Sequence, residues 1–147
     1  MSALTLPEGD WIRGITVRQP WATCILAGKS PENRPKPWSW RGWVLLHSGK
    51  AKPEPAVLRE PLVARTIRNR EPTTGAVIGV ARLIDCHQAP DGSPPCTPWA
   101  QAGAWHLVLA DVQELLLPVP VSGQLGPWKP TPDLLSQVFQ QLPDFRP

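Results

Sequence analysis

A short apolar segment bounded by proline and glycine lies near the N-terminus and limits what this chain can fold into. Pro20 suits the first turn of a helix, where its missing N–H is not needed, and Gly28 can supply the left-handed residue that ends it. Between them, three apolar residues recur at helical spacing: Ala22, Ile25 and Leu26. The stretch predicts a short helix that follows a strand ending at Val17.

Charged residues follow this helix directly. Lys29, Glu32 and Arg34 place two cations and one carboxylate within six residues, and Pro31 and Pro35 keep the stretch from being helical. We therefore expect an exposed functional loop. In it, Lys29→Ala and Arg34→Ala should weaken ligand binding and leave thermal stability nearly unchanged. A simple ion pair between Glu32 and Arg34 is the plainer alternative.

The remaining chain shows several strand patterns and few helical ones. Residues 1–10 are expected to form a loose arm. Strands are expected at Trp11–Val17, Gly42–His47, Gly75–Cys86 and Ala104–Leu116, with a short edge strand at Pro118–Ser122. Helices are expected at Glu54–Arg68, interrupted or kinked at Pro61, and at about 131–142, where Thr131 can cap. The proline-rich segment Gln88–Ala102 is expected to be a loop.

The composition favours one folded domain over residues 1–147. Hydrophobic residues make up 41% of the chain and charged residues 18%, which excludes a disordered or membrane composition. No apolar run approaches the roughly 20 residues of a membrane helix, and the N-terminus lacks a basic region followed by an apolar one. The simplest interpretation is a cytoplasmic protein with no membrane partner.

The net charge of +3 is unevenly distributed along the chain. Residues 1–73 carry twelve Lys or Arg against six Asp or Glu, whereas residues 74–147 carry three against six. This asymmetry indicates a face that meets an anion, and nucleic acid is the commonest large candidate. The alternative is a solubilising surface whose bias disappears when the chain folds.

The aromatic residues are almost all tryptophan: eight Trp, two Phe and no Tyr. Trp21, Trp38, Trp40 and Trp43 fall close to the basic stretch, and indoles among cations are suited to stacking on unpaired bases. Most tryptophans in a small domain are instead core or half-core residues. Trp38 is the preferred stacking residue because it lies in a proline-flanked loop.

The three cysteines show neither a disulfide framework nor paired metal-ligand spacing. Cys24 and Cys86 fall in apolar stretches, where a buried thiol is ordinary. Cys86, His87 and Cys96 would supply three ligands without a fourth, so no metal is expected.

Four segments in order resemble the ASCH domain, a member of the PUA-like superfamily. They are Arg18-Gln19-Pro20-Trp21 with Gly28-Lys29-Ser30-Pro31-Glu32-Asn33-Arg34, Arg41-Gly42 before the run ending Leu46-His47-Ser48-Gly49-Lys50, Gly75-Ala76-Val77-Ile78-Gly79-Val80, and Ala104-Trp105-His106-Leu107. The resemblance covers about residues 15–128. Together with the strand pattern, it implies an α+β, mainly β fold: a small PUA-like β-barrel with a short helix beside it, flanking helices, and a core over about residues 11–128.

The resemblance implies that RNA, another single-stranded nucleic acid or a modified nucleoside binds in the cleft between barrel and helix, without a cofactor. Lys29, Glu32 and Arg34 match the family motif that borders this cleft. The candidate binding residues are Arg18, Gln19, Trp21, Lys29, Glu32, Arg34, Trp38, Arg41, His47, Ser48 and Lys50.

The resemblance also implies a small hydrolase as the alternative. Some members of the superfamily are amidohydrolases that act on N4-acylcytidine, and others are ribonucleases. In those amidohydrolases a threonine nucleophile matches the position of Glu32, so that mechanism is not inherited. An enzyme would use Lys29 for proton transfer, Glu32 to activate water and His47 to protonate the leaving amine. Convergence of these three favours an enzyme or nucleotide pocket, and a flat spread of Arg34, Arg41 and Lys50 favours RNA. An interaction domain without a ligand is a third possibility.

Overall fold

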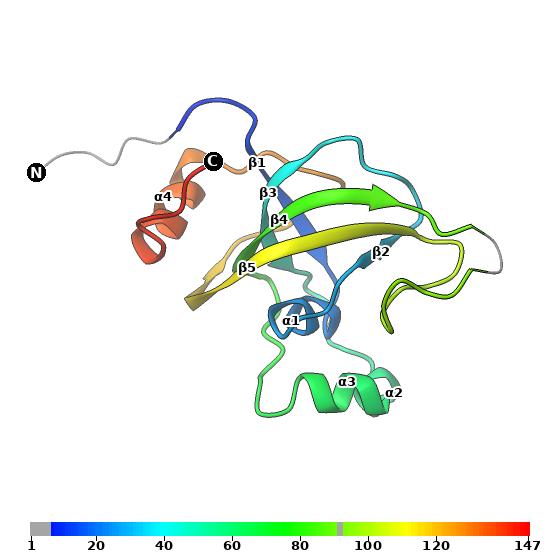
Figure 1. The fold of residues 1–147 in the computed structure, drawn as a ribbon. Coiled ribbons are helices and arrows are strands. Elements are labelled where there is room, and N and C mark those ends of the chain that lie inside the picture. The colour runs from blue at the N-terminus through cyan, green and yellow to red at the C-terminus, as the bar shows by residue number, and fades with distance from the viewer. Residues whose placement is uncertain (1–6, 91–92) are drawn as a thin grey trace, which may run out of the picture.

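The protein, described by a computed structural model over residues 7–90 and 93–147, is an α+β fold dominated by one curled sheet (Figure 1). The sheet has the strand order β1-β3-β4-β5-β2. Its strands are β1 (Ile12–Val17), β2 (Glu32–Arg34), β3 (Gly42–Ser48), β4 (Ala76–His87) and β5 (Trp105–Pro120). All neighbours pair antiparallel except β1 and β3, which are parallel.

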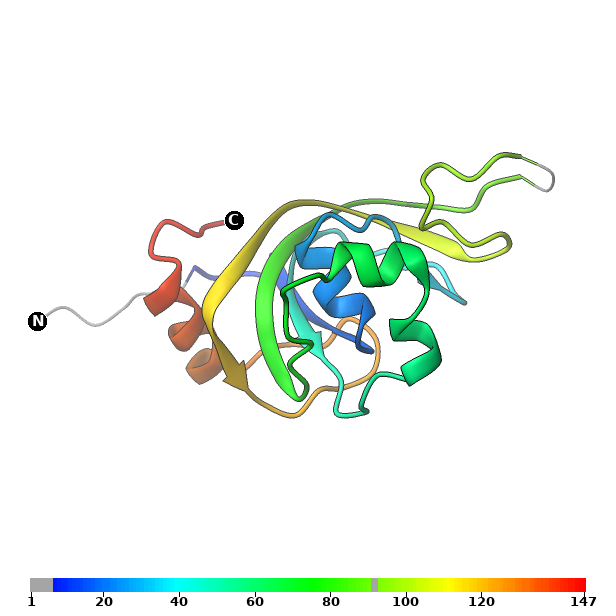
Figure 2. The ribbon, with the colours of Figure 1, turned by 90° about the horizontal axis from the view of Figure 1, so that it is seen from below.

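The sheet curls into a half-barrel, and α1 (Trp21–Leu26) lies within its curve (Figure 2). Ala22 and Ile25 of α1 pack there against buried residues of β3, β4 and β5, among them Leu46, Leu83 and Leu107. Burial of these apolar side chains is the main force that holds α1 on the sheet. The short helices α2 (Pro55–Leu58) and α3 (Pro61–Thr66) cover the outer side of α1.

The second apolar core lies on the other face of the sheet, under α4 (Pro132–Gln141). Leu134, Val138 and Phe139 of α4 pack against this face, and Trp43 and Trp128 are buried there. The hydroxyl of Thr131 accepts a hydrogen bond from the backbone N–H of Leu134, as expected for a helix cap. The predicted C-terminal helix is therefore confirmed.

The local sequence signals account for most elements. The first helix, the three long strands and the described residues of the loop after β4 lie where the sequence predicts them, and Gly28 has a φ of 111° just beyond α1. Of the expected N-terminal arm, residues 1–6 lie outside the described part of the chain, and residues 7–10 form no helix or strand.

Three predicted elements differ in the structure. Glu32–Arg34 forms a strand, β2, which pairs with the start of β5. The predicted helix over 54–68 is two short helices, because Pro61 begins a new helix. The predicted edge strand at 118–122 is not separate: β5 continues through Pro118 to Pro120, which still pairs with Ala76.

The longest helix among the described residues is α4, with 10 residues, whereas a helix that spans a bilayer needs about 20.

Candidate functional site

A cavity of about 490 Å³ opens between α1, β2, α3 and the segment that precedes β5. Its volume falls within the range of small-molecule sites in proteins. The side chains in its wall that matter chemically are Arg18, Trp21, Lys29, Glu32, Arg34 and Trp99. Five of these six were singled out in the sequence, and Trp99 was not.

Lys29 and Glu32 form a buried ion pair at this cavity. Lys29 is only 3% exposed and Glu32 only 8%, and Lys29 Nζ lies 3.1 Å from Glu32 Oε1. Lys29 Nζ also donates a hydrogen bond to the carbonyl of Pro31 at 2.8 Å. The expectation of an exposed loop is therefore wrong here, because strand β2 and the packing of α1 enclose both charges.

Arg34 continues this chain of charges. Its Nε atom lies 3.2 Å from Glu32 Oε2, and its Nη2 donates to the carbonyl of Thr16 at 2.8 Å. The Nε–H is buried and not aligned with any acceptor in the described residues. Glu32 therefore has one cation on each oxygen, and the ion-pair alternative between Glu32 and Arg34 is confirmed.

Trp38 packs against the core and beside Arg34, whose guanidinium carbon lies 5.6 Å from the indole centre. It does not line the cavity. The preference for Trp38 as the stacking residue is therefore not supported by its position, since this indole is partly covered by core side chains.

Trp21 and Trp99 are the indoles that line the cavity. Their rings meet edge to face, with centres 6.5 Å apart, and both are partly exposed. Trp99 lies in a proline-rich segment far along the chain, and sequence reasoning missed it because no local pattern links that segment to α1. An indole flanked by Pro98 within a loop was the one available signal.

Hydrogen bonds hold the Trp99 segment against β2. Asn33 Nδ2 donates to the carbonyl of Trp99 at 2.9 Å, and Asn33 Oδ1 accepts from the backbone N–H of Gln101 at 2.9 Å. Thr97 Oγ1 donates to the carbonyl of Ser30 at 2.7 Å. The cavity wall is thus fixed by specific contacts between segments about 65 residues apart in sequence.

Arg18 supplies an accessible positive charge in the cavity wall, which also includes the exposed carboxylate Glu60. Arg18 follows β1, is exposed, and forms no ion pair with any residue that the structure describes. Lys29 and Arg34 are both engaged by Glu32, so Arg18 is the cation available to an incoming anion.

His47 does not converge with Lys29 and Glu32. It is 1% exposed and outside the cavity wall, with Nε2 2.6 Å from the carbonyl of Val121 and Nδ1 3.3 Å from Thr16 Oγ1. Because a carbonyl oxygen only accepts, Nε2 carries the proton and donates a hydrogen bond to the carbonyl of Val121. This position gives no support to the predicted catalytic role of His47 as a proton donor.

Four further predicted binding residues also lie outside the cavity wall. Gln19 is buried and bonds the backbone of Thr73 and Thr23, while Ser48 donates to the carbonyl of Ala76. Both side chains satisfy backbone groups of the fold. Arg41 is exposed and donates to the carbonyls of Trp38 and Trp40, and Lys50 is exposed beyond β3.

The burial of His47 predicts a pH dependence of stability. Its pKa lies below the ordinary value, chiefly because burial disfavours the charged imidazolium. In the unfolded chain the imidazole of His47 takes up a proton near pH 6.5, and in the folded chain it does so only at lower pH. The stability that the lowered pKa contributes is therefore fully present above about pH 6.5 and is lost as the pH falls. We expect the free energy of unfolding to fall below that pH, by up to about 1.4 kcal/mol per pH unit.

Urea unfolding of wild type and His47→Gln at pH 7.5, 6.5 and 5.5 measures this dependence. The wild type should lose more stability than the variant as the pH falls. Parallel stability curves for the two proteins would contradict the assignment of His47 as a buried neutral imidazole.

Comparison with known proteins adds no assignment: no protein-family model matches this chain, and no curated protein sequence matches it.

Proposed function

We propose that this chain is an ASCH-like domain of the PUA-like class that binds a nucleotide, or one unpaired nucleotide of RNA, in the cavity beside α1. The observation that carries the proposal is that two partly exposed indoles, Trp21 and Trp99, and one accessible cation, Arg18, line a single cavity. The curled sheet with a short helix in its curve supports the PUA-like assignment.

Each group has a role that suits a nucleotide. A base can stack on an indole face, and such stacking contributes about 1–3 kcal/mol per base in proteins that bind single strands. Arg18 can form charge-assisted hydrogen bonds to a phosphate at the mouth. Asn33 already uses its amide on the backbone, so it orients the wall and does not select the base.

The position of the other cations favours a single nucleotide over a long RNA footprint. Arg41 and Lys50 are exposed but do not line the cavity, and Arg34 is turned onto Glu32 and Thr16. The flat spread of cations that would track a phosphate backbone is therefore not gathered at this site.

The hydrolase alternative has weaker support. Both carboxylate oxygens of Glu32 are paired with cations, so neither oxygen is left unpaired to position a water. His47, its intended proton donor, lies elsewhere.

Calorimetric titration with nucleoside monophosphates and the matching nucleosides tests the proposal. Arg18→Ala should weaken monophosphate binding by about tenfold, the equivalent of about 1.4 kcal/mol, and should leave nucleoside binding unchanged. The matched control is Arg41→Ala, an exposed cation outside the cavity, which should change neither. Equal effects of the two substitutions, or no binding of any nucleotide, would overturn the proposal.

Trp99→Ala provides a second test. It should weaken the binding of both nucleosides and nucleoside monophosphates by about five- to a hundredfold, because a stacking surface is lost. Incubation with N4-acetylcytidine and mass analysis then separates binding from turnover. Loss of one acetyl group would favour the hydrolase.

A further inference from the structure

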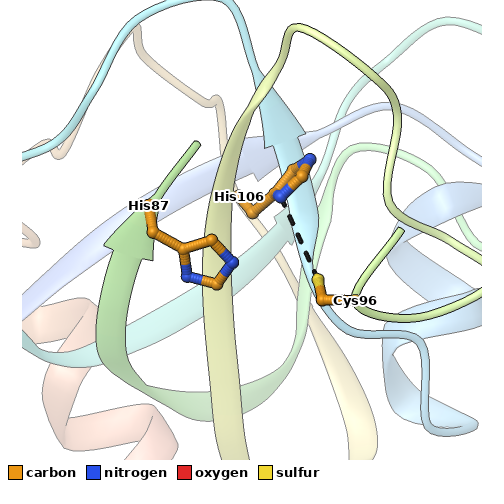
Figure 3. Close-up of side chains that lie close together, drawn as sticks. All are labelled: His87, Cys96 and His106. Carbon is orange, nitrogen blue, oxygen red and sulfur yellow. Dashed lines mark hydrogen bonds between the residues drawn. The ribbon is translucent and has the colours of Figure 1, made fainter. Parts of the chain in front are cut away.

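Three ligand-type side chains meet at the end of the sheet opposite to α4. His87 ends β4 and His106 lies near the start of β5, where the two residues are direct cross-strand partners. Cys96 comes from the segment that connects these strands. One ligand atom from each residue lies within 4.8 Å of the other two, and Cys96 Sγ is 4.0 Å from His106 Nδ1 (Figure 3).

Hydrogen bonds leave the facing nitrogen of each imidazole free to bind a metal. His87 Nδ1 lies 2.9 Å from Asp85 Oδ2, and Figure 3 shows its other ring nitrogen pointing towards His106 and Cys96. His106 Nε2 lies 2.8 Å from the carbonyl of Gln101, which can only accept, so Nδ1 keeps its lone pair. Imidazoles that ligate metals are commonly oriented in this way, by a carboxylate or a carbonyl on the other nitrogen.

We propose that His87, Cys96 and His106 form a Zn²⁺ site. Two imidazoles and one thiolate suit this borderline-soft ion. Tetrahedral bonds of about 2.0–2.3 Å place ligand atoms about 3.3–3.6 Å apart, so the Cys96 and His106 atoms need to approach by about 0.4 Å and the most distant of the three pairs by up to about 1.5 Å. Cys96 is exposed on a connecting segment and can make this adjustment. Three protein ligands leave the fourth position to water.

The site would also stabilise the cavity described above. The segment from Cys96 to Gln101 carries Trp99, and Gln101 joins the two sites because it bonds His106 on one side and Asn33 on the other. A metal on Cys96 fixes the start of this segment to the sheet. The sequence argument expected no metal, because it paired Cys96 with Cys86 and His87 and did not include His106.

Cys86 is the natural control for the thiol. It lies next to His87, but successive side chains of a strand point to opposite faces, and Cys86 packs instead against the apolar core under α1. It should not contribute to the site.

Titration of chelator-treated, full-length protein with Co²⁺ and Zn²⁺ tests the proposal. One Co²⁺ per chain should produce visible bands of a tetrahedral ion and a near-ultraviolet thiolate-to-cobalt band, and Zn²⁺ should displace it. Cys96→Ser should abolish the thiolate band, Cys86→Ser should leave it unchanged, and Asp85→Asn should weaken Zn²⁺ affinity by about 10- to 100-fold.

His87→Gln is the preferred histidine variant, since His87 is partly exposed whereas His106 is 1% exposed and its replacement risks the fold. This variant should bind both Co²⁺ and Zn²⁺ more weakly, and its circular dichroism spectrum should match that of the wild type. No stoichiometric Co²⁺ binding, no thiolate band, or an equal loss in Cys86→Ser and Cys96→Ser would overturn the proposal.

Discussion

Replacing Glu32 with alanine is expected to lower the free energy of unfolding by about 3–5 kcal/mol. The substitution leaves the Lys29 ammonium buried without its carboxylate partner, and its remaining hydrogen-bond partner among the described residues is the carbonyl of Pro31. Arg34 loses its carboxylate partner at the same time. An uncompensated buried charge is among the most destabilising changes that a single substitution can make.

Urea denaturation of four proteins measures this effect: wild type, Glu32→Ala, Lys29→Met and the double variant Lys29→Met/Glu32→Leu. The double variant should be more stable than the sum of the single effects predicts, because it removes both charges together. Glu71→Ala, at an exposed carboxylate, is the control and should change stability by no more than about 0.5 kcal/mol. A cost below about 1 kcal/mol for Glu32→Ala would show that the pair is hydrated.

This result also changes how binding is tested. Substitutions at Lys29 and Glu32 lower stability, so a loss of ligand binding in them does not separate a direct contact from local unfolding. Arg18 and Trp99 are better probes, because Arg18 is exposed and Trp99 lies in a connecting segment.

The second large effect is expected where Trp128 pairs with Gly14 of strand β1. Trp128 is 5% exposed, its indole N–H donates to Thr16 Oγ1 at 3.2 Å, and its backbone pairs with Gly14 in both directions. A side chain at Gly14 would overlap the indole, since an added Cβ meets three of its ring atoms. Trp128→Ala should therefore cost about 3–5 kcal/mol, and Gly14→Ala about 1–3 kcal/mol or more.

A double-mutant cycle isolates this contact. In the Trp128→Ala background the overlap is gone, so Gly14→Ala should have nearly no further cost. Gly75→Ala is an unsuitable control because Gly75 has a positive φ, whereas Ala64→Gly on the exposed face of α3 reports only the ordinary cost of glycine in a helix. Additive costs at Gly14 and Trp128 would contradict a direct steric contact between them.

The sequence signals were most reliable where the cause is local. Pro20 and Gly28 bound α1, Thr131 caps α4, and the apolar run after Gly42 forms a buried strand. Each of these outcomes depends on residues that are close together in the sequence. The local rules predicted a strand at Pro118 and Pro120 but not that it continues β5, because its pairing with β4 joins segments about 44 residues apart.

The sequence also identified the charged stretch at the cavity but not its environment. Lys29, Glu32 and Arg34 were singled out by residue type and spacing, and the structure places all three at one cavity with Arg18 and Trp21. Their spacing is equally compatible with an exposed loop. Pairing of β2 with β5, about 70 residues later, is what buries Lys29 and Glu32.

By itself, therefore, the sequence determined the positions of the main helices and strands and the residue types near the cavity, because proline, glycine and apolar periodicity act over short distances. The tertiary structure alone decided that His47 is an internal hydrogen-bonding residue, that Trp99 faces Trp21, and that His106 lies beside Cys96. The physical reason is that these contacts join segments brought together by strand pairing and core packing, whose free energy is distributed over the whole sheet.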